Sequence, residues 1–138
     1  MNVSELLAEA RVVETVSQGD ILEVVFRGTH EWTHGHAMKR CVDEVIAVKA
    51  IAAILFNLLE YRYVAGNDVT VLYTLALDRT TPTLKIRPIC IAATGTTYES
   101  LYGWFKSAKI IDACRVDFAD SVATGLRRLR ARLGGLPL

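Results

Sequence analysis

The stretch that decides the fold is ILFNLLEYRYVAGNDVTVLYTLAL, residues 54–77. It opens with an unbroken apolar run and then meets three turn formers, Gly66, Asn67 and Asp68. Apolar side chains recur after the turn at helical spacing, at Val69, Leu72, Leu75 and Ala76. We therefore expect a buried strand, a tight corner and a helix capped by Asn67 or Asp68, since these residue types favour helix N-termini.

Alternating segments flank this stretch on both sides. Residues 11–28, RVVETVSQGDILEVVFRG, contain two β-branched runs joined by a polar turn with Gly19, which predicts a hairpin. Residues 33–47 have the apolar spacing of a one-faced helix, and residues 51–59 form an apolar run typical of a strand covered on both faces.

The second half continues the same alternation. LKIRPICIAATG, residues 84–95, predicts a strand in which Pro88 limits pairing at the start. Three further elements follow: a helix over residues 96–110, a short strand over 112–118, and a helix over 119–135 capped by Asp120 or Ser121 and ended by Gly134. This order predicts an α/β fold with a central, mostly parallel sheet, an N-terminal antiparallel hairpin and about four flanking helices.

Composition limits the function classes. The chain has 138 residues, 51% of them apolar, and a formal net charge of +1. We expect one domain over residues 1–138, with 1–10 as an N-terminal extension and 134–138 as a C-terminal tail. The charge favours no nucleic-acid partner, and the apolar run of residues 45–59 contains Lys49 and is too short to span a membrane. Three separated cysteines and an N-terminus without a signal-peptide pattern predict a cytoplasmic protein.

The deciding stretch and PICIAATGTTYESLYGWFKSAKIIDACRVDFADSVATGL, residues 88–126, resemble the STAS domain of bacterial anti-sigma-factor antagonists, stressosome subunits and sulphate-transporter tails. The resemblance covers residues 11–133 and lies more in the order of elements than in identities. It implies a non-catalytic protein-interaction module in bacterial stress or sigma-factor regulation. Its partner would be an anti-sigma factor, a kinase or another STAS protein, and the sequence indicates no cofactor.

The resemblance also sets a register, because Asn57 and Leu58 fit the start of the family motif. Ala65 then stands at the family's Asp and Gly66 at its phosphorylated Ser or Thr, so the acceptor hydroxyl is missing. The Asp68 carboxylate could mimic a permanently modified state, but Asn67 and Asp68 could equally serve only as helix caps. By resemblance, the partner-docking residues are Gly66, Asn67, Asp68, Thr70 and Tyr73.

Two other groups of residues have candidate roles. His30, His34 and His36 lie close together but lack the spacing of a known metal motif, so we predict no metal site. Thr94, Gly95, Thr96 and Thr97 form a candidate anion or ligand turn, for which helix capping by Thr96 or Thr97 is the simpler interpretation.

Two other functions stay open. One is a small-ligand or nucleotide-binding domain, or a small enzyme, that uses the strand-to-helix turns at residues 65–68 and 93–97. The other is a structural homodimeric subunit. We find no catalytic triad and no pair of inward-facing carboxylates in the sequence, which favours the docking module.

Overall fold

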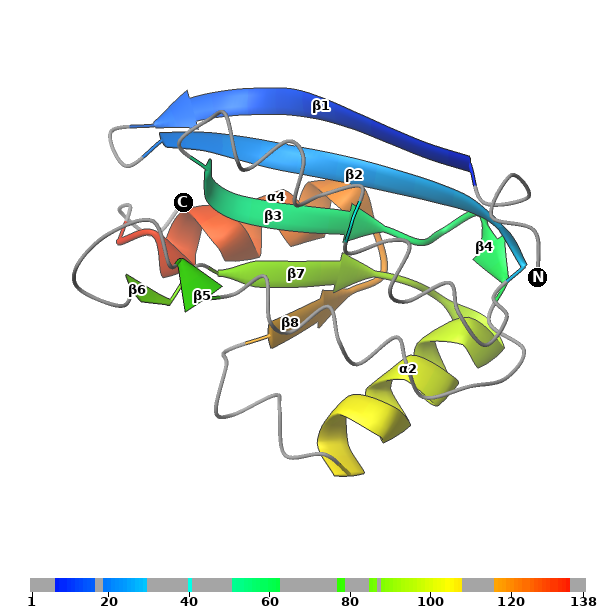
Figure 1. The fold of residues 1–138 in the computed structure, drawn as a ribbon. Coiled ribbons are helices and arrows are strands. Elements are labelled where there is room, and N and C mark those ends of the chain that lie inside the picture. Colours follow the sequence, from blue (N-terminus) through cyan, green and yellow to red (C-terminus); the bar gives the residue numbers. More distant parts are fainter. Residues whose placement is uncertain are drawn as a thin grey trace.

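The structure is a computed structural model that describes residues 7–16, 19–29, 40, 51–62, 77–78, 85–86, 88–107 and 116–134. Its centre is a six-stranded sheet (Figure 1). The main strands lie in the order β1 (Leu7–Val16), β2 (Gly19–Thr29), β3 (Ile51–Asn57), β7 (Ile89–Ala92) and β8 (Val116–Ala119). The short strand β4 (Tyr61–Arg62) pairs with the end of β2.

Strand direction follows the prediction. β1 and β2 form the antiparallel hairpin, and Gly19, which pairs with Val16, has the positive φ of 137° that the turn requires. The pairs β2–β3, β3–β7 and β7–β8 are all parallel. The predicted mostly parallel sheet with one antiparallel hairpin is therefore confirmed.

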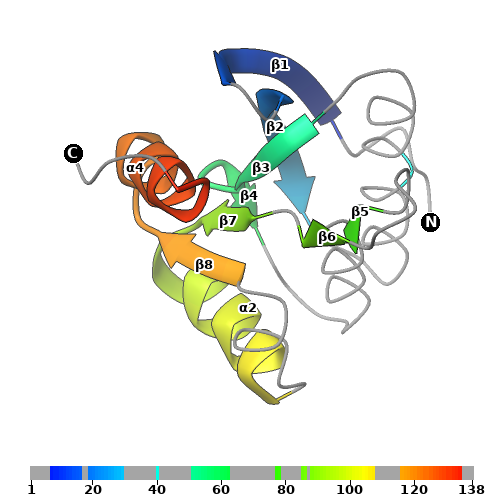
Figure 2. The same ribbon diagram turned by 90° about the vertical axis from the view of Figure 1, so that its left-hand side faces the viewer.

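Two helices cover opposite faces of this sheet, as Figure 2 shows. Leu101 and Phe105 of α2 (Gly95–Ser107) are fully buried against one face. Leu129 of α4 (Val122–Arg132) is fully buried against the other, together with Leu55 and Cys90. Alternate residues of a strand point to opposite faces of the sheet. Since both faces are covered by helices, β3 and β7 need apolar residues at every position, and both are continuous apolar runs in the sequence.

The ends of α4 are those expected from the sequence. The Ser121 hydroxyl accepts a hydrogen bond from the backbone N–H of Thr124 at 3.2 Å, which makes Ser121 the N-cap. Gly134, with φ of 77°, follows the last turn and donates its N–H to the carbonyl of Ala131. Pro88 lies between β6 (Lys85–Ile86) and β7, in agreement with its predicted limit on pairing.

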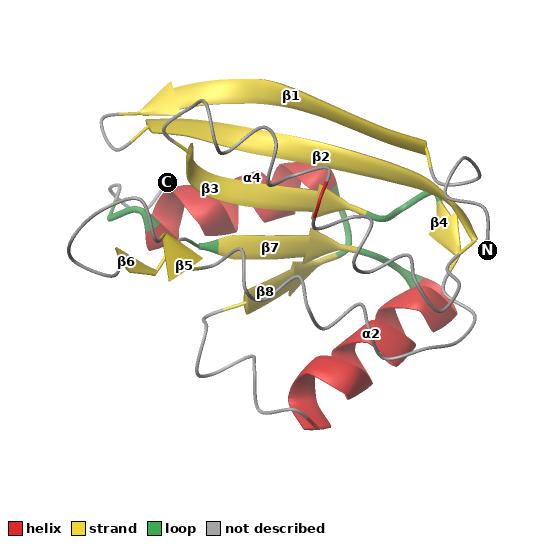
Figure 3. Cartoon of the chain, viewed as in Figure 1, coloured by secondary structure: helices red, strands yellow, loops and turns green. Residues whose placement is uncertain are grey.

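Several boundaries differ from the prediction, and Figure 3 shows the elements as the structure has them. Ala119, expected at the start of the last helix, ends β8 instead, and α4 begins at Val122. Residues 7–10, expected in an N-terminal extension, belong to β1 because they pair with residues 24–27 of the long strand β2. Leu77 and Asp78, expected at the end of a helix, form β5 (Leu77–Asp78) and pair with Ile86 and Lys85. α2 begins at Gly95, so Thr96 and Thr97 lie in its first turn and neither is the cap.

Of the four flanking helices that the sequence predicts, the described residues contain α2 and α4, and Arg40 is helical inside the expected helix of residues 33–47. The rest of that helix, and the helix expected after Asp68 up to residue 76, lie outside the described residues.

Candidate functional site

The predicted docking residues Gly66, Asn67, Asp68, Thr70 and Tyr73 all lie outside the described residues. The structure does describe the chain that leads to them, from Asn57 at the end of β3 to Arg62 in β4. This described segment includes Asn57, the first residue of the register.

Asn57 connects the end of β3 to a charged group inside the sheet. Its side-chain Nδ2 donates a hydrogen bond to Oε2 of Glu23 at 3.1 Å. Its side-chain Oδ1 accepts a hydrogen bond from the backbone N–H of Leu59, also at 3.1 Å. Asn57 therefore fixes both the turn that follows β3 and a carboxylate on the neighbouring strand β2. An amide suits this position because it donates and accepts at the same time.

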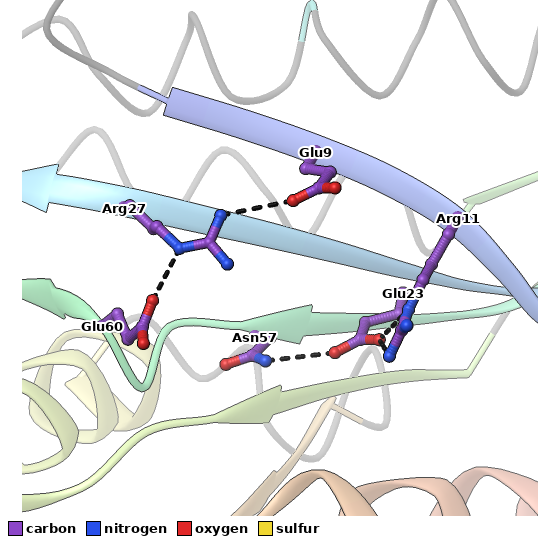
Figure 4. A network of polar contacts seen from close by, with 6 residues as sticks. All are labelled: Glu9, Arg11, Glu23, Arg27, Asn57 and Glu60. Atoms are coloured by element: carbon purple, nitrogen blue, oxygen red, sulfur yellow. Dashed lines mark hydrogen bonds and ion pairs between the residues drawn. The ribbon is translucent and has the colours of Figure 1, made fainter.

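Glu23 is the buried charge of this network (Figure 4). Its side chain is 2% exposed, and Arg11 on β1 holds it from the solvent side, with Nε and Nη2 both 2.7 Å from Oε1. Arg11 itself is 67% exposed. A carboxylate is tolerated at such a position because a guanidinium and an amide together satisfy its oxygens.

Two further ion pairs share Arg27, which lies further along β2. Arg27 donates from Nε to Oε2 of Glu60 at 2.6 Å and from Nη1 to Oε2 of Glu9 at 3.3 Å. Hydrogen bonds from Arg27 to these two glutamates, the one to Glu60 first, raise the pKa of its guanidinium above its ordinary value. Arg27 thus stays charged and ties β1, β2 and the turn after β3 together.

These residues surround a hollow of about 280 Å³, which we call the β1–β3 hollow. It is lined by Glu9, Arg11, Glu23, Val25, Arg27, Asn57, Leu59 and Glu60. The hollow lies on the face of the sheet that carries α4, because Glu23, Val25 and Arg27 alternate along β2 in phase with Ile21, which packs beside Leu129. α4 packs mainly against β3, β7 and β8, so the β2 residues Glu23, Val25 and Arg27 line the hollow and are not covered by the helix.

The candidate ligand turn at residues 94–97 is described and lies at the carboxyl end of β7. Thr94, Gly95 and Thr96 are exposed, and Gly95 has a positive φ of 60°. Thr97 is buried, and its hydroxyl donates to the backbone carbonyl of Tyr61 at 3.2 Å. Thr97 therefore anchors α2 to β4 at Tyr61, which lies four residues before Ala65.

Two arginines of α4, Arg130 and Arg132, take part in ion pairs. Arg130 pairs with Glu14 of β1 at 3.0 Å, and Arg132 pairs with Asp117 of β8 through two hydrogen bonds. Asp117 raises the pKa of Arg132 above its ordinary value through these bonds. Both pairs tie the last helix to strands at the two edges of the sheet.

His30, His34 and His36 lie outside the described residues, and the described part of the chain holds no group of three metal-binding side chains. Cys90 is a buried free thiol, and burial raises its pKa from 9.0 to about 12. No described helix is long and apolar enough to span a membrane.

Sequence reasoning missed the hollow. The signal was Glu23, a single charged residue inside the apolar run ILEVVF of an inner strand. A carboxylate at such a position requires a buried partner, so its presence alone indicated a polar network. The partners Arg11 and Asn57 could not be found without the strand register, which places β1 and β3 on either side of Glu23.

Comparison with known proteins identifies the fold. The structure is similar to the crystal structure of an anti-sigma factor antagonist from Mycobacterium paratuberculosis, with a TM-score of 0.55 and 13% sequence identity over 90% of this chain and 95% of that one. No family model matches the sequence, and no curated protein matches it. The chain has the STAS-like fold that the sequence predicted.

Proposed function

We propose that the chain is a non-catalytic regulatory module that acts by binding a protein partner in bacterial stress or sigma-factor regulation. The observation that carries this proposal is the similarity to an anti-sigma factor antagonist, which extends over 90% of the chain. A fold by itself hosts many functions, so the proposal also draws on the register that starts at Asn57. We expect the protein to work in the cytoplasm.

The proposed docking surface is the corner Gly66–Asp68 with Thr70 and Tyr73. Gly66 would let a partner backbone approach closely, and Asp68 would offer a directional polar contact. The described chain supports this position because Asn57 and the bond from Thr97 to the Tyr61 carbonyl fix the segment that leads to the corner. Tyr73 would supply the aromatic anchor that contact surfaces often use.

Binding of a purified partner to charge-reversed variants tests the proposal. A partner is first isolated by pull-down from the source cells, and its affinity is then measured by calorimetry. Asp68→Lys should abolish binding. Glu99→Lys, which makes the same charge change at an exposed position of α2, should leave binding unchanged.

Thermal melting of both variants shows whether they are folded. If a folded Asp68→Lys protein binds as tightly as the unaltered chain, the corner is not the docking surface. Light scattering of the free protein tests the alternative of a homodimeric subunit. A stable dimer that recruits no partner would replace the regulatory proposal.

The residues of the corner also determine whether the module can be regulated by phosphorylation. Since Gly66 offers no acceptor hydroxyl, a kinase that modifies related domains should leave this chain unmodified, including Thr70, which we expect one turn inside the helix and away from its N-terminal amides. Gly66→Ser should restore an acceptor at the family position. Mass spectrometry after incubation with the kinase measures both, and efficient modification of Thr70 in the unaltered chain would contradict the register.

A further inference from the structure

The β1–β3 hollow carries unbalanced charge. Three of its lining residues are glutamates and two are arginines, so the lining has one more negative than positive charge. Glu23 is matched by Arg11, which is bound to it at 2.7 Å. The excess negative charge therefore lies at the other end of the hollow, where Glu9 and Glu60 share Arg27.

The two glutamates at that end keep acceptor capacity. Figure 4 shows Glu9 and Glu60 on opposite sides of Arg27. Each binds Arg27 through Oε2, and among the described residues neither Oε1 atom has a hydrogen-bond partner. Ionised carboxylates accept hydrogen bonds on both oxygens, so this end of the hollow can accept further donors from a second cation.

Size and apolar lining restrict what that cation can be. Leu59, which is 38% exposed, and the half-buried Val25 line the same hollow and offer surface to an alkyl stem. A volume of about 280 Å³ is at the lower limit of small-molecule sites and has no room for a nucleotide. Two carboxylate oxygens are too few ligands for a bare Ca²⁺ or Mg²⁺ ion, which takes six or more oxygens.

We propose that the β1–β3 hollow is a binding site for a small organic cation, an alkylguanidinium or alkylammonium group. Its charged head donates to Glu9 and Glu60, and its stem lies on Leu59 and Val25. The group is either a free amine or a basic side chain of a protein. This site does not depend on the docking corner proposed above.

The test uses a pair of probes that differ in charge and not in shape, N-butylguanidinium and N-butylurea. Each is titrated into labelled protein, and the amide signals of Arg27, Leu59 and Glu60 are followed by NMR. N-butylguanidinium should bind in a saturable way with a Kd of about 1 mM. N-butylurea should not shift these signals.

Variants show whether the two glutamates are the acceptors. The double variant Glu9→Gln and Glu60→Gln should weaken binding of N-butylguanidinium about tenfold, because two partly screened charges are lost. It should fold normally, since the side chains are 70% and 66% exposed. The double variant Glu99→Gln and Asp120→Asn removes the same charge at exposed positions outside the hollow and should bind like the unaltered chain.

Two further probes distinguish the sources of the cation. Tighter binding of a blocked Gly-Arg-Gly tripeptide than of agmatine would assign the site to a basic side chain of a protein, and the reverse would assign it to a free amine. The proposal is overturned if no cation binds, if N-butylurea binds equally well, or if the Glu9 and Glu60 double variant binds like its control.

Discussion

Glu23 and Arg11 form an asymmetric pair, since the carboxylate is 2% exposed and the guanidinium is 67% exposed. A buried ion whose partner is removed loses its compensation, whereas an exposed cation whose partner is removed returns to water. The two residues should therefore differ in what their loss does to the free energy of unfolding, although they share one contact.

We predict that Arg11→Ala destabilises the protein more than Glu23→Gln does. Arg11→Ala leaves the Glu23 carboxylate with only the Asn57 amide, at a cost of roughly 1–3 kcal/mol after allowance for water that enters the hollow. Glu23→Gln keeps one acceptor oxygen for Arg11, turns an NH2 toward the Asn57 amide and leaves no buried charge, so it should cost about 1 kcal/mol. Urea unfolding measures both, and Arg130→Ala, whose partner Glu14 is half-buried at 34% exposure, is the matched control.

Because the Cys90 thiol is buried, we predict that the free energy of unfolding depends on pH in the alkaline range. Burial, and then the nearby Asp117 carboxylate, raise its pKa to about 12, against 9.0 for an ordinary thiol. Since the folded pKa is the higher one, this contribution to stability is complete below pH 9 and is lost as pH rises toward 12. Between pH 8 and pH 10.5 the unaltered chain should lose about 1–2 kcal/mol more unfolding free energy than Cys90→Ala. Parallel curves for the two proteins would contradict this.

At the scale of elements, the strongly patterned segments could be predicted from the sequence. β3 and β7 are continuous apolar runs, and α4 has a cap, an apolar stripe and a glycine stop, so local signals and burial agree there. The start of β1 could not be predicted, because the segment of residues 7–10 contains Leu, Ala and Glu, which favour helices. Its strand conformation comes from pairing with β2.

Gly125 shows how closely α4 approaches the sheet. A Cβ at this position would lie 2.7 Å from Cδ1 of Leu55 and 3.4 Å from Sγ of Cys90, and all three residues are buried. Leu55 is enclosed within the sheet face and has little room to move. Glycine therefore stands inside this helix because the contact with β3 leaves no space for a larger residue.

We predict opposite effects for two glycine-to-alanine substitutions. Gly125→Ala should destabilise the protein by about 1–3 kcal/mol, because overpacking against Leu55 outweighs the helix propensity of alanine. Gly103→Ala in α2, where nothing lies within 4 Å of the added Cβ and the residue is exposed, should stabilise it by up to about 1 kcal/mol. Denaturant midpoints decide the matter, and stabilisation by Gly125→Ala would show that α4 can move away from β3.

At the scale of the whole molecule, both the hollow and the two cores arise from one sheet. α2 and α4 bury opposite faces, and the ion pairs of Arg130 and Arg132 hold α4 across the strands from β1 to β8. The hollow forms where β1, β2 and β3 extend beyond the part of that face covered by α4. The sequence could predict the layers from periodicity. It could not predict the hollow, because the hollow joins residues of three strands and of the turn after β3, up to 51 positions apart from Glu9 to Glu60.

The shared sheet predicts that the chain unfolds as one unit. Leu129→Ala on the α4 face should cost about 2–5 kcal/mol and Phe105→Ala on the α2 face about 3–5 kcal/mol, since both side chains are fully buried. Because β3 and β7 contribute to both cores, each substitution should lower the stability of both faces equally. Hydrogen exchange of the amides of α2 and α4 measures this: protection should fall by the same factor in the two helices for either variant. If Leu129→Ala reduces protection in α4 and leaves α2 unchanged, the two faces unfold independently and the single-domain prediction is wrong.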